Sequence, residues 1–235
     1  MKQKITNILN KKRKSKIVSL TAYSKNIAEI LDKYCDIVLV GDSMANVLYG
    51  HKDTHKISLQ NIIQHTLSVK KGIKKSLLVV DMPKGSYSNK RLALKNARKI
   101  INLTRCDAVK IESNNKNFSI IYELVKAKIP VMGHIGFTPQ FQKKFKIQGD
   151  SINAINKLLK EALTIEKAGA FSIVLECLTP KASKLITNNL KIPTIGIGSS
   201  SNCDGQILVT DDMLGMSGFY PKFVKKYALL NRIIE

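Results

Sequence analysis

The feature that most constrains the fold is a set of eight short apolar segments spread along the whole chain. Their composition is rich in Val, Ile and Leu, and apolar residues run continuously in them rather than alternating with polar ones. Continuous apolar runs of this length are typical of parallel strands that are buried on both faces. We therefore predict strands at Ile17–Tyr23, Ile37–Asp42, Leu77–Met82, Ala108–Ser113, Val131–Gly136, Phe171–Glu176, Thr194–Ser199 and Ile207–Asp212.

Segments with helical spacing separate these runs. In the clearest of them, apolar residues recur at steps of three or four before Gly169, a residue type that often ends a helix. That stripe comprises Ile152, Ile155, Leu159, Ala162 and Ile165. Strands that alternate with helices indicate a parallel α/β fold, and eight strand candidates favour a closed (β/α)8 TIM-type barrel over an open sheet.

The chain length fits one domain. With 235 residues, 44% of them hydrophobic, the chain can bury a large core, and barrels of this size commonly form a single unit. No internal repeat or low-complexity linker divides it. We assign residues 17–235 to the barrel and residues 1–16 to a basic N-terminal segment.

Two regions fit the barrel pattern less directly. The link Ser200–Gln206 is too short to hold a crossover helix of roughly ten or more residues between parallel neighbours, so the position of strand eight is open. The tail Lys222–Glu235 has an amphipathic pattern, which predicts a final helix packed on the outside of the barrel.

Polar residues close several of the predicted strands. In a barrel of this kind the carboxyl ends of the strands build the active site. Carboxylates that end successive strands repel one another unless a cation lies between them, and an all-oxygen set favours Mg²⁺ or a similar hard ion. The residues at these ends are Asp42, Ser43, Asp81, Lys110, Glu112, His134 and Glu176.

The individual roles of two of these residues stay open from spacing alone. Lys110 lies two residues before Glu112 on one strand, so both side chains point to the same face, which we expect to be the barrel interior. Lys110 would then serve either as a structural ion-pair partner or as a ligand for a substrate anion. His134 would either touch the substrate or hold a loop.

The charge balance of the chain is strongly basic, with 39 Lys and Arg against 17 Asp and Glu. The lysines are nevertheless spread along the chain, and only residues 2–16 form a basic run. Neither aromatic interleaving nor a nucleic-acid-binding motif accompanies them. We therefore expect no nucleic-acid partner, although a basic barrel that binds a polyanion without catalysis remains an alternative.

The cysteines and the N-terminus bear on the compartment. The four cysteines form no CxxC pair, so neither a zinc site nor a disulfide framework is predicted. The first fifteen residues lack an apolar stretch with a small-residue cleavage site, and no apolar run reaches about 18 residues. We expect a cytoplasmic protein with no membrane partner.

Several longer segments resemble a known family. They occur in the same order between about Ser19 and Tyr227, and they are VGDSMANVLYGHKDT, KIES, IPVMGHIGFTPQ, KIQG, AGAFSIVLEC, IPTIGIGSSSNCDGQILVTDDMLG and PKFVKKYA. Together they resemble the signature segments of the ketopantoate hydroxymethyltransferases. The resemblance implies an enzyme of pantothenate biosynthesis. Such an enzyme transfers a hydroxymethyl group from 5,10-methylenetetrahydrofolate to 3-methyl-2-oxobutanoate, with Mg²⁺ stabilising the enolate.

The resemblance also implies residue roles. The metal ligands of the family fall on Asp42 and Asp81, with Glu112 also at the metal site. Its substrate-binding positions fall on Asp42, Ser43, Asp81 and Lys110, and its catalytic base falls on Glu176. The family is generally a large homo-oligomer, often a decamer, so we expect a homo-oligomer here.

This sequence differs from the usual family pattern at a few positions. Lys84 and Gly85 follow a proline where a more apolar pair is usual, and Thr210 stands where a histidine is common. The chain also ends soon after PKFVKKYA. A second class of enzyme stays open as an alternative: a Mg²⁺-dependent lyase or mutase of the isocitrate lyase or phosphoenolpyruvate mutase type, for which Cys177 is the one candidate catalytic cysteine.

Overall fold

Eight parallel strands form a closed barrel in the order β1 to β8, as the sequence predicts. This computed structural model describes residues 2–113, 117–142, 144–218 and 220–234. The strands are β1 (Ile17–Thr21), β2 (Ile37–Val40), β3 (Leu77–Asp81), β4 (Ala108–Glu112), β5 (Val131–Gly136), β6 (Ser172–Glu176), β7 (Thr194–Ile197) and β8 (Gly205–Leu208). β8 pairs with β1, which closes the barrel.

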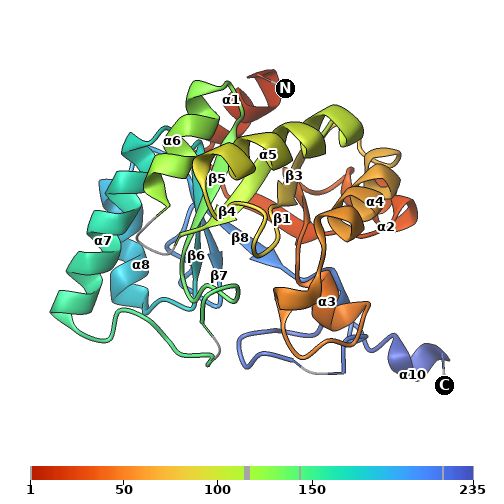
Figure 1. Cartoon of the computed structure of the whole chain (residues 1–235). Coiled ribbons are helices and arrows are strands. Elements are labelled where there is room, and N and C mark those ends of the chain that lie inside the picture. Colours follow the sequence, from red (N-terminus) through yellow and green to blue (C-terminus); the bar gives the residue numbers. More distant parts are fainter. Residues whose placement is uncertain (1, 114–116, 143, 219, 235) are drawn as a thin grey trace.

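Helices surround the barrel and cover most of its outer face (Figure 1). The longer ones follow their strands as the spacing predicts, and several begin at a side-chain cap, for example Ser151 before α7. The helices are α1 (Lys2–Asn10), α2 (Lys25–Leu31), α3 (Met44–Val47), the 3₁₀ turn η1 (Thr54–Lys56), α4 (Leu59–Lys70), α5 (Lys90–Thr104), α6 (Phe118–Lys126), α7 (Ile152–Lys167), α8 (Pro180–Asn189), α9 (Thr210–Met213) and α10 (Asn231–Ile234). Among the described residues, none of these helices is long and apolar enough to span a lipid bilayer.

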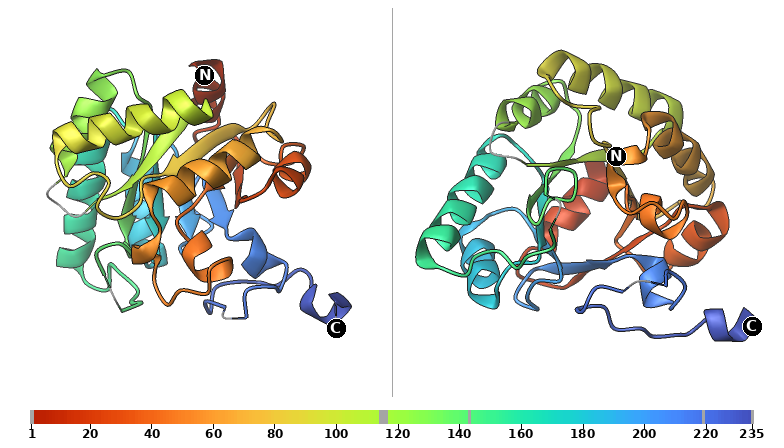
Figure 2. Two further views of the ribbon diagram at one scale, coloured as in Figure 1. Left: turned by 45° about the vertical axis from the view of Figure 1, so that its right-hand side comes forward. Right: turned by 60° about the horizontal axis from the view of Figure 1, so that its bottom comes forward.

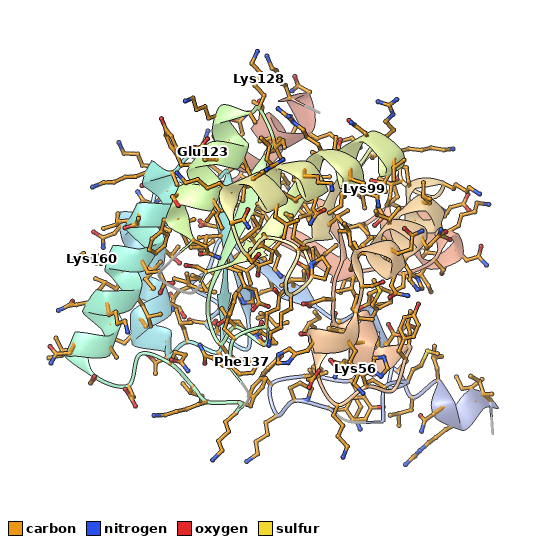
Figure 3. All side chains as sticks on the ribbon, in the orientation of Figure 1. Lys56, Lys99, Glu123, Lys128, Phe137 and Lys160 are labelled. Carbon is orange, nitrogen blue, oxygen red and sulfur yellow. The ribbon has the colours of Figure 1, made fainter. Side chains whose placement is uncertain are left out.

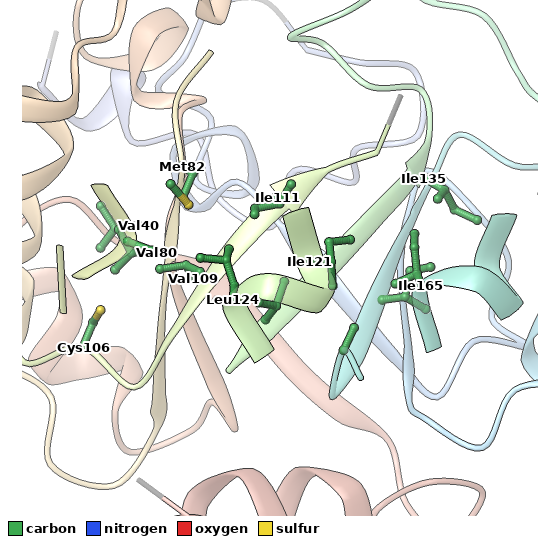
Figure 4. Packing of buried hydrophobic residues seen from close by; sticks show 14 of the residues in the cluster. Val40, Val80, Met82, Cys106, Val109, Ile111, Ile121, Leu124, Ile135 and Ile165 are labelled. Carbon is green, nitrogen blue, oxygen red and sulfur yellow. The ribbon is translucent and has the colours of Figure 1, made fainter. Parts of the chain in front are cut away.

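The apolar core has two parts because successive strand residues point to opposite faces. Outward-facing strand residues such as Val80, Val109 and Ile111 pack against the inner faces of the helices, including Ile121 and Leu124 of α6 (Figure 4). A smaller inner cluster fills the barrel itself. Its members are Ile8, Ile17, Ile37, Leu39, Leu77, Val79, Ala108, Met132, Phe171, Val174, Ile195 and Ile207.

Helix α1 closes the N-terminal end of the barrel. Its Ile8 is 3% exposed and belongs to the inner cluster, although eight of the nine helix residues lie outside the buried class. The left view of Figure 2 places α1 at the end of the molecule opposite the C-terminal tail. The open end of the barrel is therefore the one at the carboxyl ends of the strands.

Strand eight begins two residues before and ends four residues before Ile207–Asp212, the range we predicted. Gly205 and Gln206 carry no apolar signal, yet both pair with β7, and Gly205 also lies opposite Ile17 of β1. The link between β7 and β8 holds no helix, as its length requires. Asp204 stabilises it by accepting hydrogen bonds from the Thr194 backbone N–H at 2.9 Å and from the Lys12 ammonium at 2.7 Å.

The prediction of a helix over Lys222–Glu235 is wrong. Among the described residues of this range, which exclude Glu235, only Asn231–Ile234 is helical, and the tail runs away from the barrel (Figure 1). Ile233 and Ile234 are 77% and 76% exposed, so the apolar face of this short helix finds no surface to pack on within the chain. The predicted stripe on α7 also needs one correction, because Ile152 is exposed and Leu158 is buried.

Candidate active site

Ionisable side chains gather inside the barrel at the carboxyl ends of its strands. They form a polar layer next to the apolar inner cluster, and all but the last are in the buried class: Asp81, Lys110, Glu112, His134 and Glu176. Asp42 and Ser43 lie just beyond the end of β2, where Ser43 begins α3. The structure thus brings together all seven residues that the strand-end pattern singled out.

Lys110 makes an ion pair with Asp81, which also binds the backbone of Asp42. The Lys110 Nζ donates to Asp81 Oδ1 at 2.7 Å, and the Asp42 backbone N–H donates to Asp81 Oδ2 at 3.0 Å. Register places Asp81 directly opposite Lys110 on neighbouring strands. Both carboxylate oxygens of Asp81 are therefore engaged, and the side chain is held in one orientation.

Gln140 connects two of the other acidic residues, a contact that strand-end reasoning missed. Its side-chain Nε2 donates to Asp42 Oδ2 at 2.8 Å, and its backbone N–H donates to Glu112 Oε2 at 3.0 Å. The Tyr87 hydroxyl donates to Gln140 Oε1 at 2.5 Å, and Nε2 also donates to the Met82 carbonyl at 3.0 Å, so the amide orientation is fixed. The only sequence signal is the polar end of IPVMGHIGFTPQ.

His134 lies between the carboxylates of Glu112 and Glu176. Its Nε2 is 3.2 Å from Glu176 Oε2, and its Nδ1 is 3.7 Å from Glu112 Oε1. Burial lowers the pKa of His134 well below its ordinary value, with the Lys110 charge acting in the same direction. The imidazole is therefore neutral at physiological pH and separates the two acids.

Ser43 contacts Tyr23, which follows β1. The two hydroxyl oxygens are 2.8 Å apart. Burial raises the pKa of Tyr23 above its ordinary value, so its hydroxyl keeps its proton. Tyr23 is a second site residue that we did not predict, although it closes the predicted strand Ile17–Tyr23, because the prediction relied on acidic strand ends; in the structure it follows β1 (Ile17–Thr21).

Burial of several acids together changes their proton affinity. Burial and the neighbouring Asp81 raise the pKa of Asp42 to about 7, and burial raises the pKa of Glu176 to about 8 despite the nearby Lys110. The pKa of Glu112 also lies well above its ordinary value, mainly because of burial and the Asp42 charge. Without a further cation these carboxyl groups hold protons more tightly than exposed ones do.

The donor chemistry of the site fits a hard divalent cation. Asp42, Asp81 and Glu112 offer only oxygen atoms, and in the part of the chain that the structure describes Lys110 is the one buried basic side chain facing them. No three acidic, histidine or cysteine side chains among the described residues converge closely enough to form a closed metal site. The site therefore suits a hard cation because its ligands are oxygen atoms and because, among the described residues, three carboxyl groups face a single buried lysine.

Residues beside this site have structural contacts. Lys84, in the loop that departs from the family pattern, lies 3.1 Å from His55 Nδ1. His65 hydrogen-bonds the Tyr23 carbonyl at 2.8 Å through Nδ1. Cys177 is buried and free, and burial beside Glu176 raises the pKa of its thiol to about 12.

Solved structures with the same architecture share little sequence with this chain. A 2,3-dimethylmalate lyase of the PEP mutase/isocitrate lyase superfamily aligns with a TM-score of 0.64 at 15% identity, covering 87% of this chain and 80% of that one. Phosphonopyruvate hydrolase aligns with a TM-score of 0.67 at 10% identity, covering 88% and 80%. These similarities confirm the barrel fold and say nothing further about activity.

Sequence relatives are much closer. The 3-methyl-2-oxobutanoate hydroxymethyltransferase of Pelagibacter ubique is 51% identical over 100% of this chain and 91% of its own length. The enzyme of the same name from Clostridioides difficile is 46% identical over 100% and 88%. The sequence profile described as ketopantoate hydroxymethyltransferase matches residues 2–235. With the polar layer described above in place, these matches show that the chain belongs to the ketopantoate hydroxymethyltransferase family.

Proposed function

We propose that this protein transfers a hydroxymethyl group from 5,10-methylenetetrahydrofolate to 3-methyl-2-oxobutanoate, yielding 2-dehydropantoate in pantothenate biosynthesis. One observation carries the residue assignment. Glu176 stands apart from the ion pair of Lys110 with Asp81, to which the Asp42 backbone is bonded, and the neutral His134 lies between Glu176 and Glu112. Its side chain is 13% exposed, whereas that of Glu112 is 2% exposed.

Glu176 acts as the base that removes the proton from C3 of the substrate. A buried carboxylate with a raised pKa is a stronger base than an exposed one, and the raised value lies near the working pH. His134 keeps Glu112 away from this position, so the two carboxylates serve different purposes.

Lys110 and Ser43 bind the carboxylate of 3-methyl-2-oxobutanoate. The Lys110 ammonium has three donors and uses one of them on Asp81, which leaves donors for a substrate anion. Tyr23 keeps the Ser43 hydroxyl in place through the contact of 2.8 Å between their oxygens.

Asp42, Asp81 and Glu112 would hold Mg²⁺, with Asp42 and Asp81 also touching the substrate through their position at the end of β2 and β3. When bound, the cation supplies Lewis-acid stabilisation of the negative charge that develops on the substrate keto oxygen. Gln140 and Lys110 hold the carboxylates by hydrogen bonds, so the ligands are oriented before the ion arrives.

The overall step balances with one water molecule. The C3–H bond breaks and its proton passes to Glu176, C3 forms a bond to the methylene carbon of the folate, and the bonds from that carbon to the folate nitrogens break. Water supplies the hydroxyl group, and tetrahydrofolate leaves with the protons that restore its two nitrogens.

An assay of purified protein tests this function. Supplied with 3-methyl-2-oxobutanoate, methylenetetrahydrofolate and Mg²⁺, it should form 2-dehydropantoate, and EDTA should stop the reaction. Formation of no folate-dependent product, together with a lyase activity that is lost in Cys177→Ser, would overturn the proposal in favour of the lyase class. The buried, protonated thiol of Cys177 is a poor nucleophile, which favours the transferase.

The assembly of the protein is also a proposal. No helix separates β7 from β8, and Val18 on the outer face of β1 is 46% exposed. A second copy that covers this face would support the homo-oligomer that the family resemblance implies, and sedimentation velocity of the wild type and Val18→Asp tests it. A monomeric wild type would contradict it.

A further inference from the structure

Two of the signature segments have no role in the chemistry described so far, although they meet in space. Residues 146–149 (KIQG) follow Phe145, and residues 221–228 (PKFVKKYA) contain Phe223. The rings of Phe145 and Phe223 stack with centroids 6.2 Å apart, and Phe137 lies 4.6 Å from Phe145 by the same measure. We refer to Phe137, Phe145 and Phe223 as the aromatic platform.

The platform contacts the backbone at the carboxyl end of β6, where Glu176 lies, and just after the neighbouring strand β7. The Phe137 backbone N–H donates to the Glu176 carbonyl at 2.9 Å. Phe223 packs against Gly198, which follows the β7 residue Ile197 that pairs with Glu176. A Cβ atom at Gly198 would lie 2.4 Å from the Phe223 ring, and the φ of this residue is +57°, so glycine is required for the approach. The platform therefore lies next to the backbone of the residue that carries the proposed base.

Within the platform, the Phe145 ring is open to solvent, and lysines lie next to it along the chain. Phe145 is 55% exposed, and Figure 3 shows Phe137 at the same end of the molecule as Lys56 and opposite Lys128. The described residues within 137–149 and 220–228 include five lysines and no acidic residue, and Asp150 follows directly. Lys146 contacts Asp150 at 3.7 Å, an exposed pair that screens little of this charge.

An exposed aromatic ring with lysines beside it suits a ligand that has both a flat ring and negative charge. An exposed aromatic ring beside a reaction centre suits a planar ring system, since flat heterocycles stack on aromatic side chains. A rim in which lysines outnumber acidic residues suits a chain of carboxylates. A reduced folate has both parts, and its one-carbon unit must reach C3 of the substrate beside Glu176.

We propose that the aromatic platform is the folate subsite, with the pterin ring on the exposed face of Phe145 and the glutamate carboxylates at Lys144 and Lys222. This inference rests on the proposed function and adds the location of the second substrate. It also gives a role to the KIQG and PKFVKKYA segments, since they bring the stacked pair Phe145 and Phe223 together.

Binding of tetrahydrofolate, measured calorimetrically with its monoglutamate and triglutamate forms, tests the subsite. Phe145→Ala should raise the Kd of both forms by about tenfold through loss of stacking. Lys144→Glu combined with Lys222→Glu should raise the Kd of the triglutamate more than that of the monoglutamate, and should weaken its salt dependence. Matched controls are Tyr34→Ala, an aromatic residue that is 74% exposed, and Lys160→Glu on α7, both with unchanged Kd.

Two further measurements keep the test decisive. Phe145→Leu retains an apolar side chain without a planar ring and should show the same loss, which covers a misfolded alanine variant. The Kd for 3-methyl-2-oxobutanoate should change less than twofold in every variant, and an equal loss for both substrates would overturn the subsite. Unchanged folate binding in a protein that still makes 2-dehydropantoate refutes the subsite alone, whereas a wild type that makes no 2-dehydropantoate refutes the proposed function.

Discussion

Gln140 binds one oxygen of each of two acidic side chains. Its hydrogen bonds engage Asp42 Oδ2 and Glu112 Oε2, which leaves Asp42 Oδ1 and Glu112 Oε1 for another ligand. Tyr87 fixes which end of the amide faces Asp42, because its hydroxyl donates to the Gln140 oxygen. Gln140 is therefore a positioning residue for the cation site, although it touches no substrate.

We expect Gln140→Leu to weaken Mn²⁺ binding by about 10- to 100-fold, the usual effect of removing a partner of a metal ligand. Tyr87→Phe should act in the same direction and less strongly, since the amide remains. A Mn²⁺ titration followed by electron paramagnetic resonance measures this directly. Gln64→Leu, on the exposed face of α4, is the control, and equal Mn²⁺ affinity in Gln140→Leu and Gln64→Leu would contradict the role.

The raised pKa of Glu176 gives the stability of the metal-free protein a pH dependence. The pKa rises from an ordinary 4.5 to about 8, so between these values the unfolded chain is ionised at this residue while the folded chain keeps the proton. Unfolding then releases a proton, and the free energy of unfolding falls as pH rises across this window. Asp42, with a pKa of about 7, adds to the same trend.

Glu176→Gln should therefore stabilise the metal-free protein at pH 8 by on the order of 2 kcal/mol, and much less at pH 5. Urea denaturation in EDTA at the two pH values measures the difference. Equal effects of the substitution at pH 5 and pH 8 would show that Glu176 is not held in a desolvated setting.

At the scale of elements, Asp204 substitutes for the helix that the β7–β8 link lacks. Its Oδ2 accepts from Lys12 Nζ and from the backbone and side chain of Thr194, and its Oδ1 accepts from the Arg13 backbone N–H at 3.1 Å. Burial opposes ionisation, but these donors, chiefly Lys12 and Thr194, lower the pKa of Asp204 overall. The carboxylate joins the segment after α1 to the last two strands.

Asp204→Asn should lower the free energy of unfolding at pH 7 by about 3 kcal/mol, because it leaves the Lys12 ammonium, whose side chain is 10% exposed, without its charge partner. The pKa of Asp204 is depressed, so its contribution is present above the ordinary value of 3.8 and is lost as pH falls through the lower folded value. Thermal unfolding from pH 7 to pH 3 measures this. Glu29→Gln, in the exposed pair with Lys25, should cost under about 0.5 kcal/mol.

The sequence predicts a strand reliably where continuous burial of its side chains determines its position. The strands containing Asp81, Lys110 and Glu176 are continuous apolar runs, so their polar ends could be recognised in advance. Gln140 and Tyr87 could not be assigned in the same way, because each reaches the site from a loop. Tyr23 closes a predicted strand, but a tyrosine there gives no signal of its own in a pattern of acidic strand ends.

Errors arose where tertiary contacts override local pattern. Gly205 and Gln206 became strand because β7 and β1 supply hydrogen-bonding partners on both sides. The tail around Ile233 has a helical pattern, yet without a surface to pack on it forms only one short turn of helix.

For the molecule as a whole, the two ends of the barrel differ in kind. The N-terminal end is filled by the inner apolar cluster and closed by Ile8 of α1, whereas the other end carries the acids, Lys110 and the aromatic platform. The formal net charge of +22 is distributed over the chain, and the acidic layer lies buried within it. This asymmetry confines chemistry to one end and favours anionic substrates there.

Exchange of the C3 proton of 3-methyl-2-oxobutanoate in D₂O, followed by NMR without folate, tests the central claim most directly. The wild type with Mg²⁺ should exchange this proton, and Glu176→Gln should slow the exchange by about 100-fold or more, as should EDTA. Glu123→Gln, a surface carboxylate on α6 that contacts Lys90, should exchange at the wild-type rate. Exchange at the wild-type rate in Glu176→Gln would contradict the account.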